Sequence, residues 1–248
     1  MTIENDDDLQ HLKVIGQIVG QTLKKMLDYV EPGMTTRELD LYGGELLKQA
    51  GARSAPQLAY GFPGFTCISL NEEAAHGVPG DRIIQAGDMI NIDVSAELNG
   101  YWADTGGSAV ITPGDPIKQS LCDATRLALS QAIKTAKAGA PINHIGKAIQ
   151  RVAKEKGYRI IRNLCSHGVG RFIHEEPKEI PGYYNPHDKR VLHEGLVITI
   201  EPFLSTKSRS VSEAKDGWTL IAPKGNLSAQ YEHTMVITQG EPLLLTAV

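Results

Sequence analysis

The sequence has few cysteines, and their spacing does not suit a disulfide framework. Its three cysteines, Cys67, Cys122 and Cys165, lie far apart in the chain and form no Cys-x-x-Cys pair. A zinc site built on thiolates needs closely spaced cysteines, so that kind of site is excluded as well. Any metal bound by this chain must be held by oxygen and nitrogen atoms.

Long apolar runs and clusters of basic residues are also missing. No segment approaches the ~20 consecutive apolar residues of a membrane span, and the first residues are acidic where a signal peptide would be basic. The net charge is −4, and no run of Lys or Arg offers an electrostatic footprint for nucleic acid or an anionic membrane. We therefore expect a cytoplasmic protein with neither of these as a partner.

Three widespread catalytic motifs are absent too. The chain has no Gly-x-Ser-x-Gly elbow, no His-Glu-x-x-His and no Gly-x-x-x-x-Gly-Lys-Ser/Thr phosphate loop. Its 248 residues are 41% hydrophobic and 22% charged, which is ordinary globular usage. This length suits one hydrophobic core or two closely packed halves, and we expect a single catalytic domain over residues 1–248.

One pattern of elements occurs twice. Apolar residues at helical spacing run from Asp8 to Val30, and a capping box at Thr35–Glu38 opens a second helix that ends at Gly51. Later, Asp115 and Pro116 start a helix, and another helix ends at Gly157. The repeat predicts two pseudo-symmetric halves, about 1–113 and 114–248, although such an order of elements can also recur by chance.

Each half also contains an apolar strand that leads to a carboxylate six residues after a glycine. The first such segment is Gly87–Asp93 and the second is Gly195–Glu201. If the halves pack about a pseudo-twofold axis, Asp93 and Glu201 lie on equivalent central strands and face one another. These two carboxylates therefore mark a candidate catalytic site.

Four acids share an apolar or aromatic, strand-like setting: Asp93, Asp104, Glu201 and Glu232. Any one of them could simply point to water, as most acidic side chains do. Together in one interior site, four free carboxylates would strongly raise each other's pKa values. Two divalent cations would balance their charge, so we predict a metal site.

Histidines in glycine-marked segments supply nitrogen donors. His167 stands beside Gly168 and Gly170, where the backbone can approach a site closely, and is our candidate for the single nitrogen ligand. One imidazole with four carboxylates suits Mn, Fe(II), Co or Zn, and the sequence does not choose among them. His76 and His174 could each be ordinary loop histidines. They are candidate site residues only because they occur together with the candidate metal ligands.

These segments together resemble methionine aminopeptidases of the short, type I bacterial kind, which have the pita-bread fold. That α+β fold has two pseudo-symmetric halves that share a curved, mainly antiparallel sheet with helices outside. The resemblance extends from the first helix to about Thr238. The blocks that carry it are Pro63-x-x-x-Cys67-Ile68-Ser69-x-Asn71-Glu72, His76-Gly77-x-Pro79, Asn91-Ile92-Asp93-Val94, Ala103-Asp104-Thr105, His167-Gly168-x-Gly170, His174-Glu175-x-Pro177, Ile200-Glu201-Pro202 and Glu232-His233-Thr234.

The resemblance implies a hydrolase that removes the amino-terminal methionine when the second residue is small, using a water or hydroxide shared by two metals. Asp104 and Glu232 would bridge the metals, and His167 and Glu201 would complete one of them. Asp93 would chelate the other metal. Catalysis would also involve His76, His174 and Glu201, and the substrate would contact His76, His174, Phe62, Cys67 and Trp218.

The chain departs from the commonest family pattern at Ala59, where Tyr is frequent, and at Ile173, where Phe is frequent. Both changes concern the rim of the methionine pocket, and Phe62, Cys67 and Trp218 could also be plain core residues. The expected partners are the amino termini of nascent polypeptides at the ribosome. We expect the protein to be a monomer.

Two alternatives remain at this point. One is an Xaa-Pro aminopeptidase or dipeptidase of the same fold; these relatives usually have an additional amino-terminal domain, for which 248 residues leave no room. The other is a non-catalytic pita-bread protein that binds partners. Such proteins typically lose metal ligands, whereas all five candidate ligands are present here.

Overall fold

The computed structural model describes all residues 1–248 and contains both helices and strands, so the expected α+β class is confirmed. The helices are α1 (Asp6–Tyr29), α2 (Thr36–Gln49), α3 (Ala55–Tyr60), α4 (Pro116–Ile133) and α5 (Asn143–Lys156). The strands are β1 (Arg53–Ser54), β2 (Cys67–Leu70), β3 (Glu73–Ala75), β4 (Met89–Leu98), β5 (Tyr101–Val110), β6 (Arg159–Ile160), β7 (Cys165–Gly168), β8 (Glu175–Pro181), β9 (Val197–Ile200), β10 (Phe203–Ser205), β11 (Ser212–Glu213), β12 (Leu220–Ile221), β13 (Ser228–Gln230), β14 (His233–Val236) and β15 (Leu243–Leu244).

The helices begin and end where local sequence signals place them. The side chain of Thr35 accepts a hydrogen bond from the backbone of Glu38, and the side chain of Glu38 accepts one from the backbone of Thr35, so the predicted capping box is formed. Asp115 caps α4 with Pro116 in its first turn. Gly157 ends α5 in the left-handed conformation, with φ at 80°.

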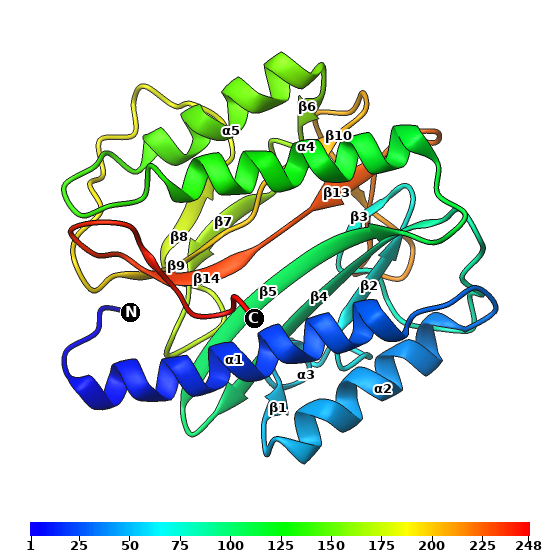
Figure 1. Ribbon diagram of the computed structural model, residues 1–248, viewed down its shortest axis with the longest axis horizontal. Helices are drawn as coiled ribbons and strands as arrows, with labels where there is room; N and C mark the ends of the chain where they lie inside the picture. The colour runs from blue at the N-terminus through cyan, green and yellow to red at the C-terminus, as the bar shows by residue number, and fades with distance from the viewer.

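Two helix pairs lie on opposite sides of the strands. Figure 1 shows α1 and α2 below the long β4–β5 hairpin, and α4 and α5 above β9, β13 and β14. The two larger hydrophobic clusters follow the same division, one built around α1 and the other around α4 and α5. Each half therefore brings most of its own core.

The strands form four antiparallel ladders rather than one continuous ladder. In the first, β4 lies between β2 and β5 and also pairs with β1; in the second, the order is β15-β14-β9-β7-β8. Two three-stranded ladders, β13-β10-β6 and β11-β12-β3, complete the structure. No helix combines the length and the apolarity needed to cross a bilayer.

Hydrogen bonds across the seam between the halves join the two larger ladders. The backbone N–H of Glu232 donates to the carbonyl of Gly106 over 2.9 Å. The hydroxyl of Thr234 accepts from the Asp104 N–H over 3.0 Å and donates to the Asp104 carbonyl over 2.7 Å. The middle of β5 is thereby fixed against Glu232 and against β14.

The expectation that a strand ends at each carboxylate is right for one half only. Glu201 directly follows β9, but Asp93 lies in the middle of β4, which continues to Leu98. The reason is that β4 has partners on both sides, and Val94 and Ala96 continue its buried, apolar pattern. Asp93 is therefore held by a central strand, not by a strand end.

The capping box gives a test of how much local structure contributes to stability. We expect Thr35→Ala to lower the free energy of unfolding by about 1 kcal/mol, because an N-cap hydrogen bond is lost. Thr35→Ser keeps the hydroxyl, so its free energy of unfolding should be close to that of the parent protein. Urea unfolding followed by circular dichroism measures both, and equal losses for Ala and Ser would contradict the capping account.

Candidate metal centre

Three buried side chains from two strands and one connecting segment gather at the seam. Asp104 comes from β5, His167 from β7 and Glu232 from the residue pair between β13 and β14. One donor atom of each lies within 4.8 Å of the others. Their exposed fractions are only 6%, 4% and 2%. An oxygen-rich donor set of this kind, shielded from water, is suited to a divalent cation.

The two other predicted ligands lie beside this cluster. The Nε2 atom of His167 is 3.4 Å from Oε1 of Glu201 and 3.8 Å from Oδ2 of Asp104. Asp93 lies on the neighbouring strand, two residues before Ser95, the register partner of Asp104, and lines the same cavity as Asp104, His167 and Glu201. The fold therefore brings together all five residues that the sequence singled out.

Unpaired buried oxygens show that the site is suited to a cation. Oδ1 of Asp104 and Oε1 of Glu232 are buried and have no hydrogen-bond partner. Nearly all buried polar atoms in proteins have a partner, and an orphaned carboxylate oxygen is costly. The other oxygen of Glu232 accepts a hydrogen bond from Nε2 of Gln230 over 2.9 Å. The free oxygens of two different acids are thus available for metal coordination.

Burial and mutual repulsion govern the protonation of the acids. Burial raises the pKa values of Asp104, Glu201 and Glu232 well above their usual range, and the neighbouring carboxylates raise them further. Burial is also the main reason for the raised pKa of Asp93. Without cations the group therefore retains protons, whereas cations would favour the charged carboxylates.

His167 is a neutral donor in this setting. Burial lowers its pKa to about 3, with a further lowering from the neighbouring His174. Its Nδ1 lies 3.0 Å from the carbonyl oxygen of Gly168. We assign the proton to Nδ1, because a carbonyl can only accept, and this leaves the Nε2 lone pair facing Asp104 and Glu201.

An apolar cavity of about 250 Å³ opens onto these ligands. Phe62, Cys67 and Trp218 line it, and the rings of Phe62 and Trp218 meet edge to face with centroids 5.3 Å apart. Burial raises the pKa of Cys67 well above its usual value, and nearby carboxylates add to the effect, so the thiol stays neutral. All three residues thus lie on the wall of this cavity, and their contact with a substrate stays a prediction.

Of the two departures from the family pattern, only one reaches the cavity. Ile173 is 2% exposed and lines it, whereas Ala59 does not. The adjacent Tyr60 lines the cavity instead, and its hydroxyl lies 2.5 Å from Nδ1 of His174. Sequence reasoning missed Tyr60 as a site residue, because its partner is 114 positions away.

His174 lies directly against the ligand His167. The two rings meet edge to face with centroids 4.2 Å apart. Although His174 reaches solvent through the mouth of the cavity, surrounding protein atoms desolvate its ring, and His76 repels its charge. These two effects lower the pKa of His174 to about 4. The ring is neutral at neutral pH and Tyr60 fixes its orientation.

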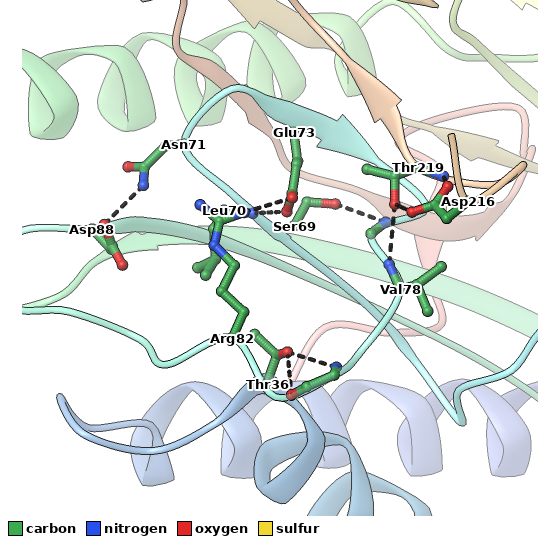
Figure 2. A network of polar contacts seen from close by, with 12 residues as sticks. Thr36, Ser69, Leu70, Asn71, Glu73, Val78, Arg82, Asp88, Asp216 and Thr219 are labelled. Atoms are coloured by element: carbon green, nitrogen blue, oxygen red, sulfur yellow. Dashed lines mark hydrogen bonds and ion pairs between the residues drawn. The ribbon is translucent and has the colours of Figure 1, made fainter. Parts of the chain in front are cut away.

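The loop that carries His76 is held in place from both sides. His76 has a positive φ of 54°, which only a well-fixed backbone keeps in a residue other than glycine. The following N–H of Gly77 donates to Ser69, and that of Val78 donates to Thr219. Figure 2 shows Ser69 and Thr219 on the two sides of this segment, with Asp216 bound to Thr219.

The same network connects the His76 loop with the loop of Trp218. Asp216 accepts hydrogen bonds from the backbone of Trp218 over 2.9 Å and from the hydroxyl of Thr219 over 2.6 Å. At the other end of the loop, Glu73 pairs with Arg82 over 2.5 Å, as Figure 2 shows. One polar network therefore positions a candidate catalytic histidine and a pocket aromatic together.

The fold and this donor set are those of a metallopeptidase. The chain belongs to metallopeptidase family M24, whose family model matches residues 10–239. It is 45% identical to methionine aminopeptidase 2 of Bacillus subtilis (strain 168) over 247 residues, which is 99% of each chain. The family is thus shown both by the family model and by a full-length relative.

Solved structures agree with this placement and with the pita-bread fold. The crystal structure of a methionine aminopeptidase from Thermotoga maritima covers 100% of both chains with a TM-score of 0.95 and 31% identity. A prolidase from Pyrococcus furiosus gives a TM-score of 0.78 with 25% identity, and only 66% of that chain is covered. The similarity is greater to the first of these two structures, in fold, identity and coverage.

The orphaned oxygens make a prediction about metal-dependent stability. Mn²⁺ should raise the thermal midpoint of the parent protein, because a ligand at 100 times its Kd adds about 2.7 kcal/mol to the stability of the folded state. In Glu232→Gln the rise on adding Mn²⁺ should be largely lost. The midpoint in EDTA should stay the same or increase, because one member of a repulsive carboxylate group is removed.

Thermal unfolding by differential scanning fluorimetry, with and without Mn²⁺, measures both effects. Glu213→Gln is the matched control, since this acid is exposed on β11. An equal Mn²⁺ response in the Glu232 and Glu213 variants would exclude Glu232 as a ligand.

Proposed function

We propose that this chain is a metal-dependent aminopeptidase that removes the amino-terminal methionine from nascent proteins and peptides with a small second residue. The observation that carries the proposal is a set of four carboxylates and one imidazole, all buried except the half-buried Asp93, at the base of an apolar cavity. The full-length relatives named methionine aminopeptidase support the same activity.

Asp93, Asp104, His167, Glu201 and Glu232 would hold two divalent cations. Asp104 and Glu232 would each contribute a buried oxygen that has no protein partner. The bound cations would supply a Lewis acid for the scissile carbonyl and would lower the pKa of a water nucleophile. Mn, Fe(II), Co and Zn all fit a donor set of oxygen with one nitrogen.

The protein's own side chains would bind and orient the peptide. The free amino group would approach Asp93, which is only half-buried and faces the cavity. His76 and His174 stand at the mouth of the cavity, where a neutral imidazole can donate a hydrogen bond to the oxygen that gains charge. Glu201 would hold and pass the proton that moves to the leaving amine.

The methionine side chain would occupy the apolar part of the cavity. Phe62, Cys67 and Trp218 present rings and a neutral thiol there, which suit a polarisable thioether. Buried Ile173 closes one side with a branched aliphatic group. A pocket of this composition would favour an unbranched apolar side chain over a charged one.

Neither alternative function is favoured. The prolidase similarity is weaker and covers two thirds or less of that enzyme's length, while the full-length relatives are named methionine aminopeptidases. A purely binding protein would not need to retain the complete donor set. We also propose that the protein acts as a monomer in the cytoplasm, on nascent chains at the ribosome.

The proposal is tested by peptide hydrolysis with titrated metal. Met-Ala-Ser should be cleaved in the presence of Mn²⁺ or Co²⁺, and an Ala-Pro peptide should not. We expect Asp93→Ala to lower kcat/KM by at least about 100-fold. Loss of a residue that only hydrogen-bonds to a metal ligand typically costs about 10–100-fold, and loss of the ligand itself should cost more. Asp81→Ala removes an exposed carboxylate and is the control. Preferential cleavage of Ala-Pro would overturn the proposed specificity.

The contact between Tyr60 and His174 gives a second kinetic prediction. Tyr60→Phe removes the hydroxyl that orients the imidazole, so kcat should fall about 10-fold while KM changes little. Tyr29→Phe, at a half-exposed site on α1 that faces Tyr42, serves as the control. A rise in KM with an unchanged kcat would show that Tyr60 only contacts the substrate.

A further inference from the structure

A second cavity, of about 520 Å³, lies on the outer side of the C-terminal half. We call it the arginine pocket and define it by four cationic residues and three tyrosines. The cations are Lys154, Arg159, Arg162 and Arg209, and the tyrosines are Tyr158, Tyr183 and Tyr184. No acidic residue lines it. It is formed around α5, β6 and the loop after β10, and Figure 1 shows these elements together.

The arginines of this pocket are the ones that the protein leaves unpaired. The chain has ten arginines, and the seven outside the pocket each form an ion pair with a carboxylate: Arg37, Arg53, Arg82, Arg126, Arg151, Arg171 and Arg190. Arg159, Arg162 and Arg209 form no such pair, and all three line one cavity. The convergence leaves a concentrated positive charge in a protein whose net charge is −4.

The backbone around the pocket is fixed by hydrogen bonds. The N–H of Arg162 donates to the carbonyl of Arg209 over 2.8 Å, and Arg159 pairs with Ser205 in the β6–β10 ladder. Asn163 extends this connection through two hydrogen bonds with Val211. The three guanidinium groups therefore extend from a preformed frame, which lowers the entropy cost of binding an anion.

The tyrosines indicate that the ligand has an aromatic part in addition to a negative charge. The guanidinium of Arg162 lies 4.0 Å from the centroid of the Tyr183 ring, so it is stacked and its N–H edges remain free. Tyr184 is 40% exposed, and the ammonium of Lys147 lies over one face of its ring, 5.5 Å from the centroid, so a base would stack on the other face. Guanidinium edges bind phosphate and aromatic faces stack on bases, and the volume is within the about 300–1,000 Å³ of ligand pockets.

We propose that the arginine pocket binds a nucleotide, with its phosphate on the arginines and its base on the tyrosines. The nucleotide can be free or part of single-stranded RNA, because the same chemistry recognises both. Absence of a Lys or Arg run in the sequence does not argue against such a site, since the cations come from three separate segments. Arg162 in this pocket directly precedes Asn163 and Leu164, which line the metal cavity.

The test compares two double variants that remove the same charge. Arg159→Gln/Arg162→Gln changes the pocket, and Arg37→Gln/Arg151→Gln removes two ion-paired arginines outside it. The probes are a short fluorescein-labelled oligouridine, read by anisotropy, and ADP, read by calorimetry. Thermal midpoints confirm that all variants are folded, independently of peptidase activity.

The pocket variant should bind the probes at least about 10-fold more weakly than the control variant, because two phosphate contacts are lost. Its slope of log K against log salt for oligouridine should be smaller by about 0.7 for each lost contact. Binding of both probes indicates a site for free nucleotide, and binding of oligouridine alone indicates RNA as the source; both support the proposal.

Tyr184→Leu tests the stacking part. It should weaken ADP binding several-fold more than the binding of inorganic phosphate. Equal affinity of the pocket and control variants, or no binding of either probe to the parent protein, would overturn the proposal. So would an unchanged ADP affinity in Tyr184→Leu. Binding of a labelled Glu-rich peptide by a parent protein that binds neither nucleotide probe would also overturn it and would identify a site for peptide carboxylates.

Discussion

The repulsion among four carboxylates at the seam between the halves is the constraint on which the site depends. Asp104, Glu201 and Glu232 are buried, Asp93 lies beside them, and two of their oxygens have no protein partner. Such a group is unfavourable as free anions and retains protons until cations enter. Metal binding, protonation and the stability of the seam are therefore linked.

The fold keeps these donors in place with hydroxyl, amide and backbone groups that are themselves buried. Thr234 binds both backbone groups of Asp104, Gln230 binds one oxygen of Glu232, and Ser166 accepts the N–H of Glu201. Since the ligands come from both halves, neither half contains the site alone. The single domain over residues 1–248 that we propose agrees with this shared arrangement.

Two cavities of different composition are lined by consecutive residues of one segment in the C-terminal half. The metal cavity is lined by three carboxylates, three histidines, one lysine and apolar groups, whereas the arginine pocket has cations and tyrosines without an acid. The segment Arg162–Leu164 lies between them. Arg162 faces a positively charged pocket, although it is only five residues from the candidate ligand His167. This short segment therefore contributes to the candidate enzyme site and also to the proposed nucleotide site.

The sequence by itself determined the features that depend on local interactions or on residue type. The Thr35–Glu38 capping box, the α4 start at Asp115 and the α5 end at Gly157 follow from contacts within a few residues. Four of the five candidate ligands could be found because a carboxylate in an apolar strand needs compensation, and the fifth, His167, because glycines lie beside it in the sequence. Tertiary structure alone decided that β4 continues past Asp93, that Tyr60 meets His174 and that three unpaired arginines converge. These contacts join segments far apart in the chain, and only the packing of the two halves brings them together.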